Sequence, residues 1–208
     1  MTGHSMTGHA PRNTACRILL VRHAVAEGNG RFQGQTDVPL SPAARPQLRV
    51  LVRKIARHPV RAVYSSDLQR AHATATTVAR RLGLEVIVRP GLREIDFGCW
   101  EGLSWRQVAR RFPRLSRAWV ARFPHHPIPG AERFDAFKKR VTRELDEIMT
   151  ANTGSCVAIV THAGVARLIL AGALGVPDRK LFRMALDPGA LSVIDFFQDG
   201  ATVQLVNG

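Results

Sequence analysis

Arg17-Ile-Leu-Leu-Val-Arg22 is an almost continuously apolar run that ends on an arginine and is followed at once by His23. Such a run is typical of a strand that is buried on both faces of a sheet. Ser155-Cys-Val-Ala-Ile-Val160 repeats the pattern and is followed by Thr161 and His162. Two strands of this kind predict a sheet that is covered by helices on both sides.

Helical and strand patterns alternate along the rest of the chain. Ser41 and Pro42 suit the N-cap and the first position of a helix. The sequence also predicts strands over residues 62–65 and 85–88, helices over 68–82, 131–150 and 164–174, and a hairpin of 191–197 with 201–206. We therefore expect an α/β fold, a three-layer αβα sandwich whose sheet is mostly parallel with an antiparallel edge.

Length and composition indicate a globular protein and exclude fibrous, disulfide-stapled and disordered classes. The chain has 208 residues, of which 45% are hydrophobic and 22% are charged, so it is long enough to bury a sizeable core. Its three cysteines show no zinc or disulfide spacing, and no apolar run is long enough to span a bilayer. We expect a cytoplasmic protein that uses no metal or other cofactor and binds no membrane.

Residues 1–15 repeat Met-Thr-Gly-His and lack the apolar segment of a signal peptide, so we expect them to be disordered. Residues 16–208 are expected to form a single domain. Within it, the proline-interrupted stretch at about 103–130 is interpreted as an inserted cap. This stretch contains six arginines and no acidic residue, in a chain whose net charge is +14. Such a charge attracts anions, which suits a phosphorylated substrate.

Polar side chains follow the ends of four predicted strands, where ligands bind in open α/β sheets. Along the chain they are Arg22, His23, Arg70, Glu94 and His162. Two arginines and a histidine can bind a tetrahedral phosphoryl dianion, and a second, neutral histidine can attack phosphorus. A protonated glutamate can supply the proton that the leaving oxygen needs. The sequence therefore predicts a site for phosphoryl transfer that needs no metal.

Five blocks of sequence, in order, resemble the histidine phosphatase superfamily, also called the phosphoglycerate mutase family. They are Leu20-Val21-Arg22-His23-Ala24 with Asn29, Gln33-Gly34 with Asp37, Ser65-Ser66-Asp67-Leu68-Gln69-Arg70-Ala71, Leu92-Arg93-Glu94 with Trp100-Glu101-Gly102, and Thr161-His162-Ala163-Gly164. The resemblance covers residues 17 to about 175. It implies the αβα sandwich that the strand and helix patterns predict independently.

The resemblance also implies a role for each strand-end residue. His23 would be the nucleophile that forms a phosphohistidine intermediate. Arg22, Arg70 and His162 would bind the transferred phosphoryl group. Glu94 would protonate the leaving group and then act as the base that activates water.

Five further residues are candidates for substrate binding. The resemblance places Asn29 in the pocket and gives Gln33 and Gly34 in the next block. In the cap, Arg106 can attract an additional anionic group of the substrate, and Trp105 can stack on a ring. The expected partner is therefore a small phosphorylated molecule.

The sequence departs from the family pattern close to the nucleophile. Ala24 stands where glycine is usual, and Val25-Ala26 replaces the usual polar pair. The segment between Glu94 and the next predicted long helix is shorter than the insertion that mutases of this family usually have. The loop at Trp100-Glu101-Gly102 also resembles the phosphatases, above all the α-ribazole and broad-specificity phosphatases. We therefore expect phosphomonoester hydrolysis, with α-ribazole 5′-phosphate as one candidate substrate.

Other functions stay open at this point. Phosphoglycerate mutase or sugar-bisphosphatase activity would use the same residues, and so would the removal of phosphate from phosphohistidine in proteins, which the Arg-His-Ala sequence suggests. A scaffold without catalysis is a further alternative. The net charge also fits a nucleic-acid binder, but the sequence has no zinc finger, aromatic RNA-binding motif or helix-turn-helix signature, so we expect no nucleic-acid partner. A homodimer is one expectation for the oligomeric state.

Overall fold

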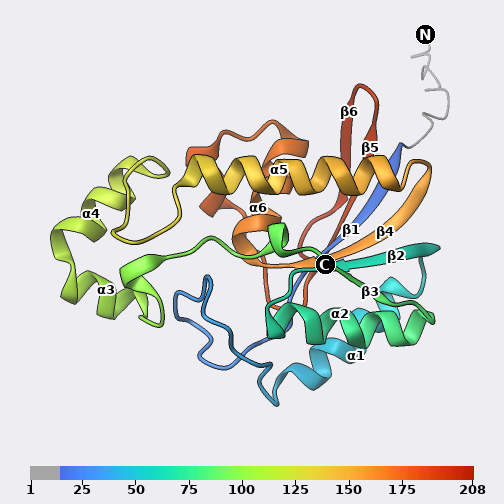
Figure 1. Ribbon diagram of the computed structural model, residues 1–208, viewed down its shortest axis with the longest axis horizontal. Coiled ribbons are helices and arrows are strands. Elements are labelled where there is room, and N and C mark those ends of the chain that lie inside the picture. The colour runs from blue at the N-terminus through green and yellow to red at the C-terminus, as the bar shows by residue number, and fades with distance from the viewer. Residues whose placement is uncertain (1–14) are drawn as a thin grey trace, which may run out of the picture.

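A six-stranded sheet lies at the centre of the protein (Figure 1). The computed structural model describes residues 15–208. The expectation of disorder for residues 1–15 therefore falls outside the described residues, apart from Ala15 itself. The strands are β1 (Cys16–Arg22), β2 (Val60–Ser65), β3 (Val86–Val88), β4 (Ser155–Thr161), β5 (Leu191–Phe197) and β6 (Gly200–Leu205). Their order is β3-β2-β4-β1-β5-β6. The first four are mutually parallel and the last two add antiparallel pairings, which confirms the predicted sheet.

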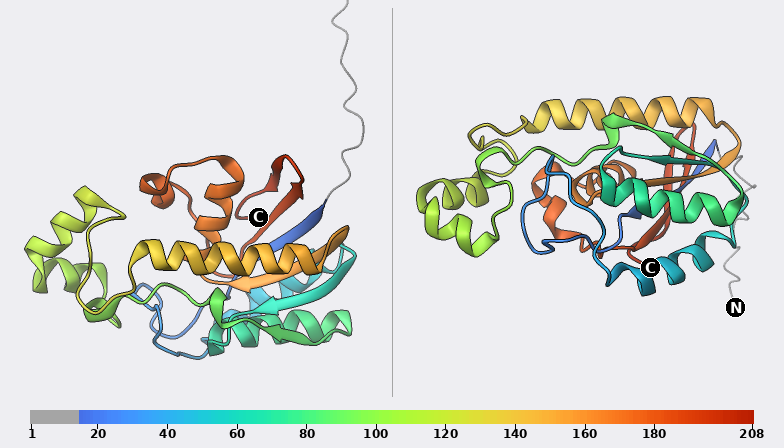
Figure 2. Two further views of the ribbon diagram at one scale, coloured as in Figure 1. Left: turned by 45° about the horizontal axis from the view of Figure 1, so that its top comes forward. Right: turned by 60° about the horizontal axis from the view of Figure 1, so that its bottom comes forward.

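Helices cover both faces of this sheet, as Figures 1 and 2 show. One face carries α1 (Ala44–Ile55) and α2 (Gln69–Leu82), and the other carries α5 (Phe134–Ala151) and α6 (Ala163–Leu174). Side chains of β1 alternate between the two resulting cores. Leu19 packs in the core beneath α1 and α2, and Leu20 packs in the core beneath α5 and α6. The predicted three-layer αβα sandwich is confirmed.

The predicted start of the first helix is wrong. The helix begins at Ala44, and Ser41 Oγ accepts a hydrogen bond from the Ala43 amide (3.3 Å) instead of capping the helix. Pro46 accounts for the later start. A proline is tolerated in the first turn of a helix, where its missing N–H would have no acceptor, and the observed start places Pro46 in that turn.

Residues 103–130, called the cap below, form two helices at one end of the molecule (Figure 1). α3 (Trp105–Arg111) begins with a capping box between Ser104 and Gln107. α4 (Pro113–Arg122) has Pro113 at its first position, so this proline starts a helix where an interruption was expected. The described part of the chain also contains three short 3₁₀ helices, η1 (Pro90–Leu92), η2 (Gly98–Trp100) and η3 (Asp178–Arg183). No helix among residues 15–208 is long and apolar enough to cross a membrane.

Candidate active site

Strand register places two histidines side by side at the carboxyl edge of the sheet. Arg22, at the end of β1, pairs with Thr161, at the end of β4. His23 and His162 are the next residues, and the His23 amide donates to the Thr161 carbonyl (2.8 Å). Their ring centroids are 5.1 Å apart and both side chains are buried. The end of the β1–β4 pair therefore holds two shielded imidazoles in contact.

A backbone carbonyl fixes the tautomer of His23. Its Nδ1 lies 2.8 Å from the carbonyl oxygen of Ala24. A carbonyl oxygen can only accept a hydrogen bond, so Nδ1 carries the proton and Nε2 keeps its lone pair. Burial, helped by the charges of Arg70 and Arg22, lowers the pKa of His23 to about 3. The ring is therefore neutral at pH 7, and its Nε2 is available as a nucleophile.

His162 makes a different set of hydrogen bonds. Its Nε2 lies 2.7 Å from Ser66 Oγ, whereas its Nδ1 is buried without a partner. Burial above all, and then the neighbouring His23 and Arg70, hold the pKa of His162 well below its usual range. When Ser66 donates to Nε2, Nδ1 carries the proton of the neutral ring. His162 can then donate that proton to a bound oxygen atom.

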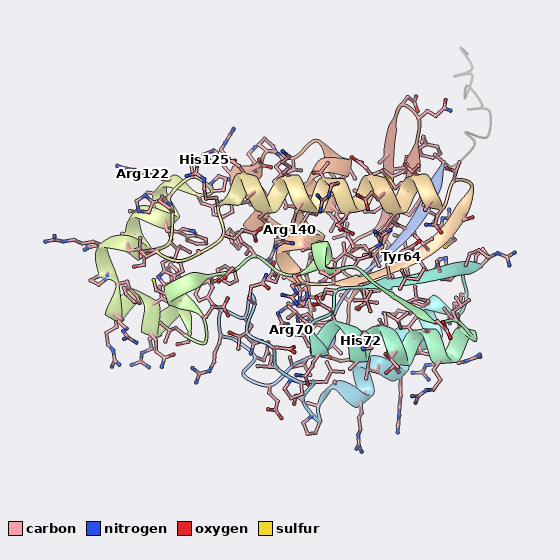
Figure 3. The ribbon with its side chains drawn as sticks, viewed as in Figure 1. Tyr64, Arg70, His72, Arg122, His125 and Arg140 are labelled. Atoms are coloured by element: carbon pink, nitrogen blue, oxygen red, sulfur yellow. The ribbon has the colours of Figure 1, made fainter. Side chains whose placement is uncertain are left out.

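Two arginines beside these histidines are held by backbone carbonyls. Arg70 lies at the start of α2 (Figure 3); it is fully buried and donates at 2.8–3.0 Å to the carbonyls of Gln33, Gly34 and Thr36. Arg22 donates to the Leu186 carbonyl (2.5 Å). Among residues 15–208, neither arginine has a carboxylate within salt-bridge distance. Their charges are therefore left for a bound anion.

Glu94 reaches the same edge from the loop that follows β3. Its carboxylate accepts hydrogen bonds from the amides of Ile95 (3.0 Å) and Gly164 (2.8 Å). Gly164 is the second residue of α6, where amides have no partner within the helix. A Cβ atom on Gly164 would lie 2.3 Å from Glu94 Oε1, so only glycine permits this close approach. The buried Glu94 carboxyl group is thus held by the amide of Gly164, which comes two residues after His162 in the sequence.

Glu101 ties two loops of the site together, and sequence reasoning gave it no role of its own. Its carboxylate accepts hydrogen bonds from the amides of residues 34–36 (2.9–3.3 Å) and of Phe97 (3.0 Å). Gly34 and Thr36 of this segment, together with the preceding Gln33, supply the carbonyls that bind Arg70. Glu101 therefore positions Arg70 through the backbone of that segment. Its only sequence signal is its place in the motif Trp100-Glu101-Gly102.

Unpartnered buried polar atoms are concentrated at this site. Within residues 15–208, five buried side-chain nitrogen or oxygen atoms have no hydrogen-bond partner. Three of them belong to the site, and they are Arg22 Nε, Arg70 Nε and His162 Nδ1. Buried polar groups are normally satisfied, so three unused donors within this group of residues suit an anion with several oxygen atoms.

A cavity of about 420 Å³ extends from this edge of the sheet toward the cap, and Arg70 and His162 lie outside its wall. Arg22, His23 and Glu94 lie in its wall. Two of the predicted substrate-binding residues, Asn29 and Gln33, lie there too. The structure thus places the predicted nucleophile, the predicted acid and part of the predicted binding set around one space.

Three predicted substrate-binding residues lie outside the cavity wall. Gly34 lies behind it, where its carbonyl accepts from Arg70. The ring of Trp105 packs against Trp100 with centroids 6.1 Å apart, and Arg106 is exposed on the same helix. The orientation of α3 depends on packing inside the cap, which the spacing of nearby residues does not determine.

Aromatic side chains of the cap and of η3 line the cavity. Trp119 and Phe123 come from the cap, and Phe182 comes from η3. The Phe123 ring lies 5.1 Å from Trp119 and 4.7 Å from Phe182. Arg167 of α6 also lines the cavity and donates to the Met184 carbonyl (3.0 Å). No local pattern distinguishes Phe123 or Phe182 from core residues.

The sequence of this chain matches one family over almost its whole length. Residues 18–208 match the histidine phosphatase superfamily (branch 1). The chain belongs to this superfamily. The match includes all five strand-end residues at the carboxyl edge of the sheet. The predicted family is therefore confirmed.

Relatives in this superfamily include several phosphatases. A bifunctional protein of Mycobacterium tuberculosis is 39% identical over 200 residues, which are 94% of this chain and 55% of that protein. The chain thus spans about half the length of the first curated relatives that it matches. Phosphoserine phosphatase 1 of Hydrogenobacter thermophilus is 33% identical, with 86% of this chain and 85% of that protein covered. The α-ribazole phosphatase structure from Shigella flexneri is 29% identical, covers 92% of this chain and 96% of its own, and has a TM-score of 0.83.

The buried histidines should make the stability of this histidine phosphatase superfamily member depend on pH. The pKa of both His23 and His162 is lower in the folded chain than the usual 6.5, so the unfolded chain binds more protons below that value. The stability that the neutral rings confer is present above pH 6.5 and is lost as pH falls toward the folded pKa. When the pH falls from 7 to 5, we expect the free energy of unfolding to decrease by about 2 kcal/mol for each of the two rings.

Urea unfolding in phosphate-free buffer at the two pH values measures this loss. The variant His162→Gln should remove about half of the pH dependence, because glutamine does not titrate. An equal pH dependence in the variant and the wild type would contradict the assignment of the effect to the buried rings.

Proposed function

We propose that this protein hydrolyses phosphomonoesters through a phosphohistidine formed on His23. The observation that carries the proposal is the cluster of unused donors on Arg22, Arg70 and His162 beside a neutral His23 whose Nε2 lone pair is free. A phosphoryl group bound by those donors would lie next to the nucleophile. Two similar proteins that are named as phosphatases match this chain over most of their own length, which supports the same reaction class.

In the first step, His23 Nε2 attacks phosphorus. The P–N bond forms while the P–O bond to the alcohol breaks, and the Glu94 carboxyl group gives its proton to the leaving oxygen. Arg22 and Arg70 stabilise the negative charge on the transferring group. In the second step, Glu94 accepts a proton from water, whose oxygen attacks phosphorus. The P–N bond breaks, inorganic phosphate leaves, and the histidine and the acid return to their starting forms.

The cavity favours an alcohol with an aromatic or apolar body. Beyond Arg22, its wall carries the rings of Trp119, Phe123 and Phe182, and Phe182 is 55% exposed. Exposed rings at a cavity wall bind flat apolar groups by stacking and by loss of water-exposed area. α-Ribazole 5′-phosphate, whose base is a benzimidazole, fits this description. A relative that is named for phosphoserine makes that small polar ester the main alternative substrate.

A panel of esters tests the reaction and the substrate together. We expect phosphate release from p-nitrophenyl phosphate and α-ribazole 5′-phosphate in the presence of EDTA, with kcat/KM at least about tenfold above that for phosphoserine or 3-phosphoglycerate. Among residues 15–208, no three His, Cys, Asp or Glu side chains are grouped so as to hold a metal ion. Release that EDTA abolishes would contradict the metal-independent reaction, and a preference for phosphoserine would contradict the aromatic substrate.

A matched pair of variants localises the preference within the same panel. Phe182→Ala should raise KM about tenfold for the aromatic esters and leave phosphoserine unchanged, because one stacking contact contributes about 1.4 kcal/mol. Val120→Ala is the control, since Val120 is an exposed apolar residue of α4 that does not line the cavity. Equal KM values for the two variants would place the aromatic group elsewhere.

A further inference from the structure

Arg140, on α5, binds the backbone of the loop that carries Glu94. Its Nη1 donates to the carbonyls of Gly91 (2.8 Å) and Arg93 (2.7 Å). Its Nη2 donates to the carbonyl of Glu94 itself (3.1 Å). Figure 3 shows Arg140 between α5 and the sheet, close to the centre of the molecule. One guanidinium thus contacts three carbonyls within four residues of the loop.

A carboxylate fixes the orientation of this guanidinium. Glu132, just before α5, accepts from Arg140 Nε (2.9 Å) and Nη2 (2.7 Å) in a two-point pair. The guanidinium also lies over the Phe137 ring, 5.0 Å from its centroid. The amide of Glu132 donates to the Asp96 carbonyl (3.1 Å), so the pair is itself joined to the loop after Glu94. A bidentate pair stacked on a ring leaves the guanidinium a single orientation.

The position of Arg140 on its helix argues against a role in packing alone. Phe137, three residues before it, and Glu144, four residues after it, are both buried on α5. Arg140 therefore lies within the stripe of the helix that faces the core. An ion pair at such a place is weak evidence for stability, because apolar side chains of similar volume often stabilise a fold as well or better. The contacts to the Glu94 loop give a reason for a charge there.

We propose that Arg140, oriented by Glu132, is a positioning residue for Glu94. It fixes the backbone of Glu94, and so keeps the carboxyl group at the N-terminus of α6, within reach of the leaving oxygen. The inference rests on the proposed function, because it assigns Arg140 to the proton transfer of the first step. In that step, the proton leaves the Glu94 carboxyl group for the bridging oxygen as the P–O bond breaks and the P–N bond to His23 forms.

The leaving group separates this role from a structural one. Proton donation accelerates the loss of an alcohol with a high pKa and contributes little when the leaving group is a stable phenolate. In the first step, 2-phenylethyl phosphate therefore depends on a well-placed Glu94, and 2,4-dinitrophenyl phosphate does not. The second step uses Glu94 for both esters, so the comparison is made in kcat/KM, which reports the first step alone. Both esters carry an aromatic ring for the cavity. A defect in folding or in phosphoryl binding would slow the two esters equally.

The experiment measures kcat and KM of the full chain on both esters. Arg140→Met should lower kcat/KM for 2-phenylethyl phosphate about 30-fold and lower kcat/KM for the dinitrophenyl ester less than about threefold. Arg140→Lys should recover part of the loss, because an ammonium group cannot pair with Glu132 in two places. Glu94→Gln should show the same pattern with a larger amplitude. Adding Arg140→Met to Glu94→Gln should cause no further loss on the alkyl ester.

Arg143→Met is the matched control on the same helix. Arg143 is exposed and pairs with Glu147 (3.8 Å), without contact to the Glu94 loop. Its variant should leave the ratio of the two rates unchanged. If Arg140→Met does not fold, Glu132→Gln replaces it and should show a smaller loss with the same dependence on leaving group.

Two outcomes are kept apart by this design. Equal losses on both esters for a folded Arg140 or Glu132 variant would overturn the positioning role and leave the proposed function intact. A wild-type protein that releases phosphate from neither ester would instead reject the proposed function itself.

Discussion

Replacing His23 by alanine should lower kcat/KM for every phosphomonoester by at least about 10³-fold. The variant loses the Nε2 lone pair that the Nδ1 hydrogen bond to the Ala24 carbonyl (2.8 Å) leaves free. His162 does not replace it, because the Nε2 atom of His162 is engaged by Ser66 (2.7 Å). Steady-state phosphate release measures the loss. His72→Ala, an exposed histidine on α2, should retain wild-type activity.

Trapping the intermediate identifies which histidine is phosphorylated. Wild-type protein mixed with a labelled ester and quenched in alkali should carry label that acid removes, as expected of a phosphoramidate. His23→Ala should carry none, whereas His162→Gln should still form the labelled protein at a reduced rate. Label on the His23→Ala variant would show that the nucleophile lies elsewhere.

Arg70→Met should be the second most damaging change. Arg70 is fully buried, and its variant removes both a charge from the phosphoryl site and three hydrogen bonds to the segment of residues 33–36. We expect kcat/KM to fall by about 10³-fold and inhibition by inorganic phosphate to weaken in parallel. The free energy of unfolding should fall by about 2 kcal/mol, because buried carbonyls lose their donor. Kinetics, phosphate inhibition and urea unfolding measure the three effects.

Comparison with two other variants separates charge from loop anchoring. Arg70→Lys keeps a charge but cannot reach three carbonyls and a phosphoryl group at once, so it should recover only part of the activity. Arg80→Met removes an exposed arginine from the same helix and should change neither quantity. An Arg70→Met variant with normal phosphate inhibition would exclude Arg70 from the phosphoryl site.

The sheet and the position of the candidate site could be predicted because both depend on local patterns. The apolar run before Arg22 marks a strand buried on both faces, and the residues that follow parallel strands must meet at one edge. His23 and His162 each follow such a strand, so the pattern of the sequence is enough to bring them together. The start of α1 was harder to predict, because Ser41 is a typical N-cap residue although the helix begins only at Ala44.

Interactions between distant segments could not be predicted in the same way. Trp105 and Arg106 lie on a helix whose orientation depends on packing within the cap, and neither faces the cavity. Phe182 reaches the cavity because η3 folds back beside the cap, which nothing near it in sequence specifies. Arg140 left one signal, a cation in the buried stripe of an amphipathic helix, three residues after Phe137.

The aromatic side chains of the cavity come from different parts of the chain than the reactive groups. His23 and His162 directly follow strands of the sheet, and Glu94 lies in the loop after β3. The aromatic side chains of the cavity come from the cap and from η3. Divergence can therefore act on these two parts separately. Insertions and substitutions in the cap or in η3 can exchange one alcohol for another while the phosphoryl chemistry is inherited unchanged. Such a division allows one ancestral reaction to spread over many metabolites by the drift of two peripheral segments.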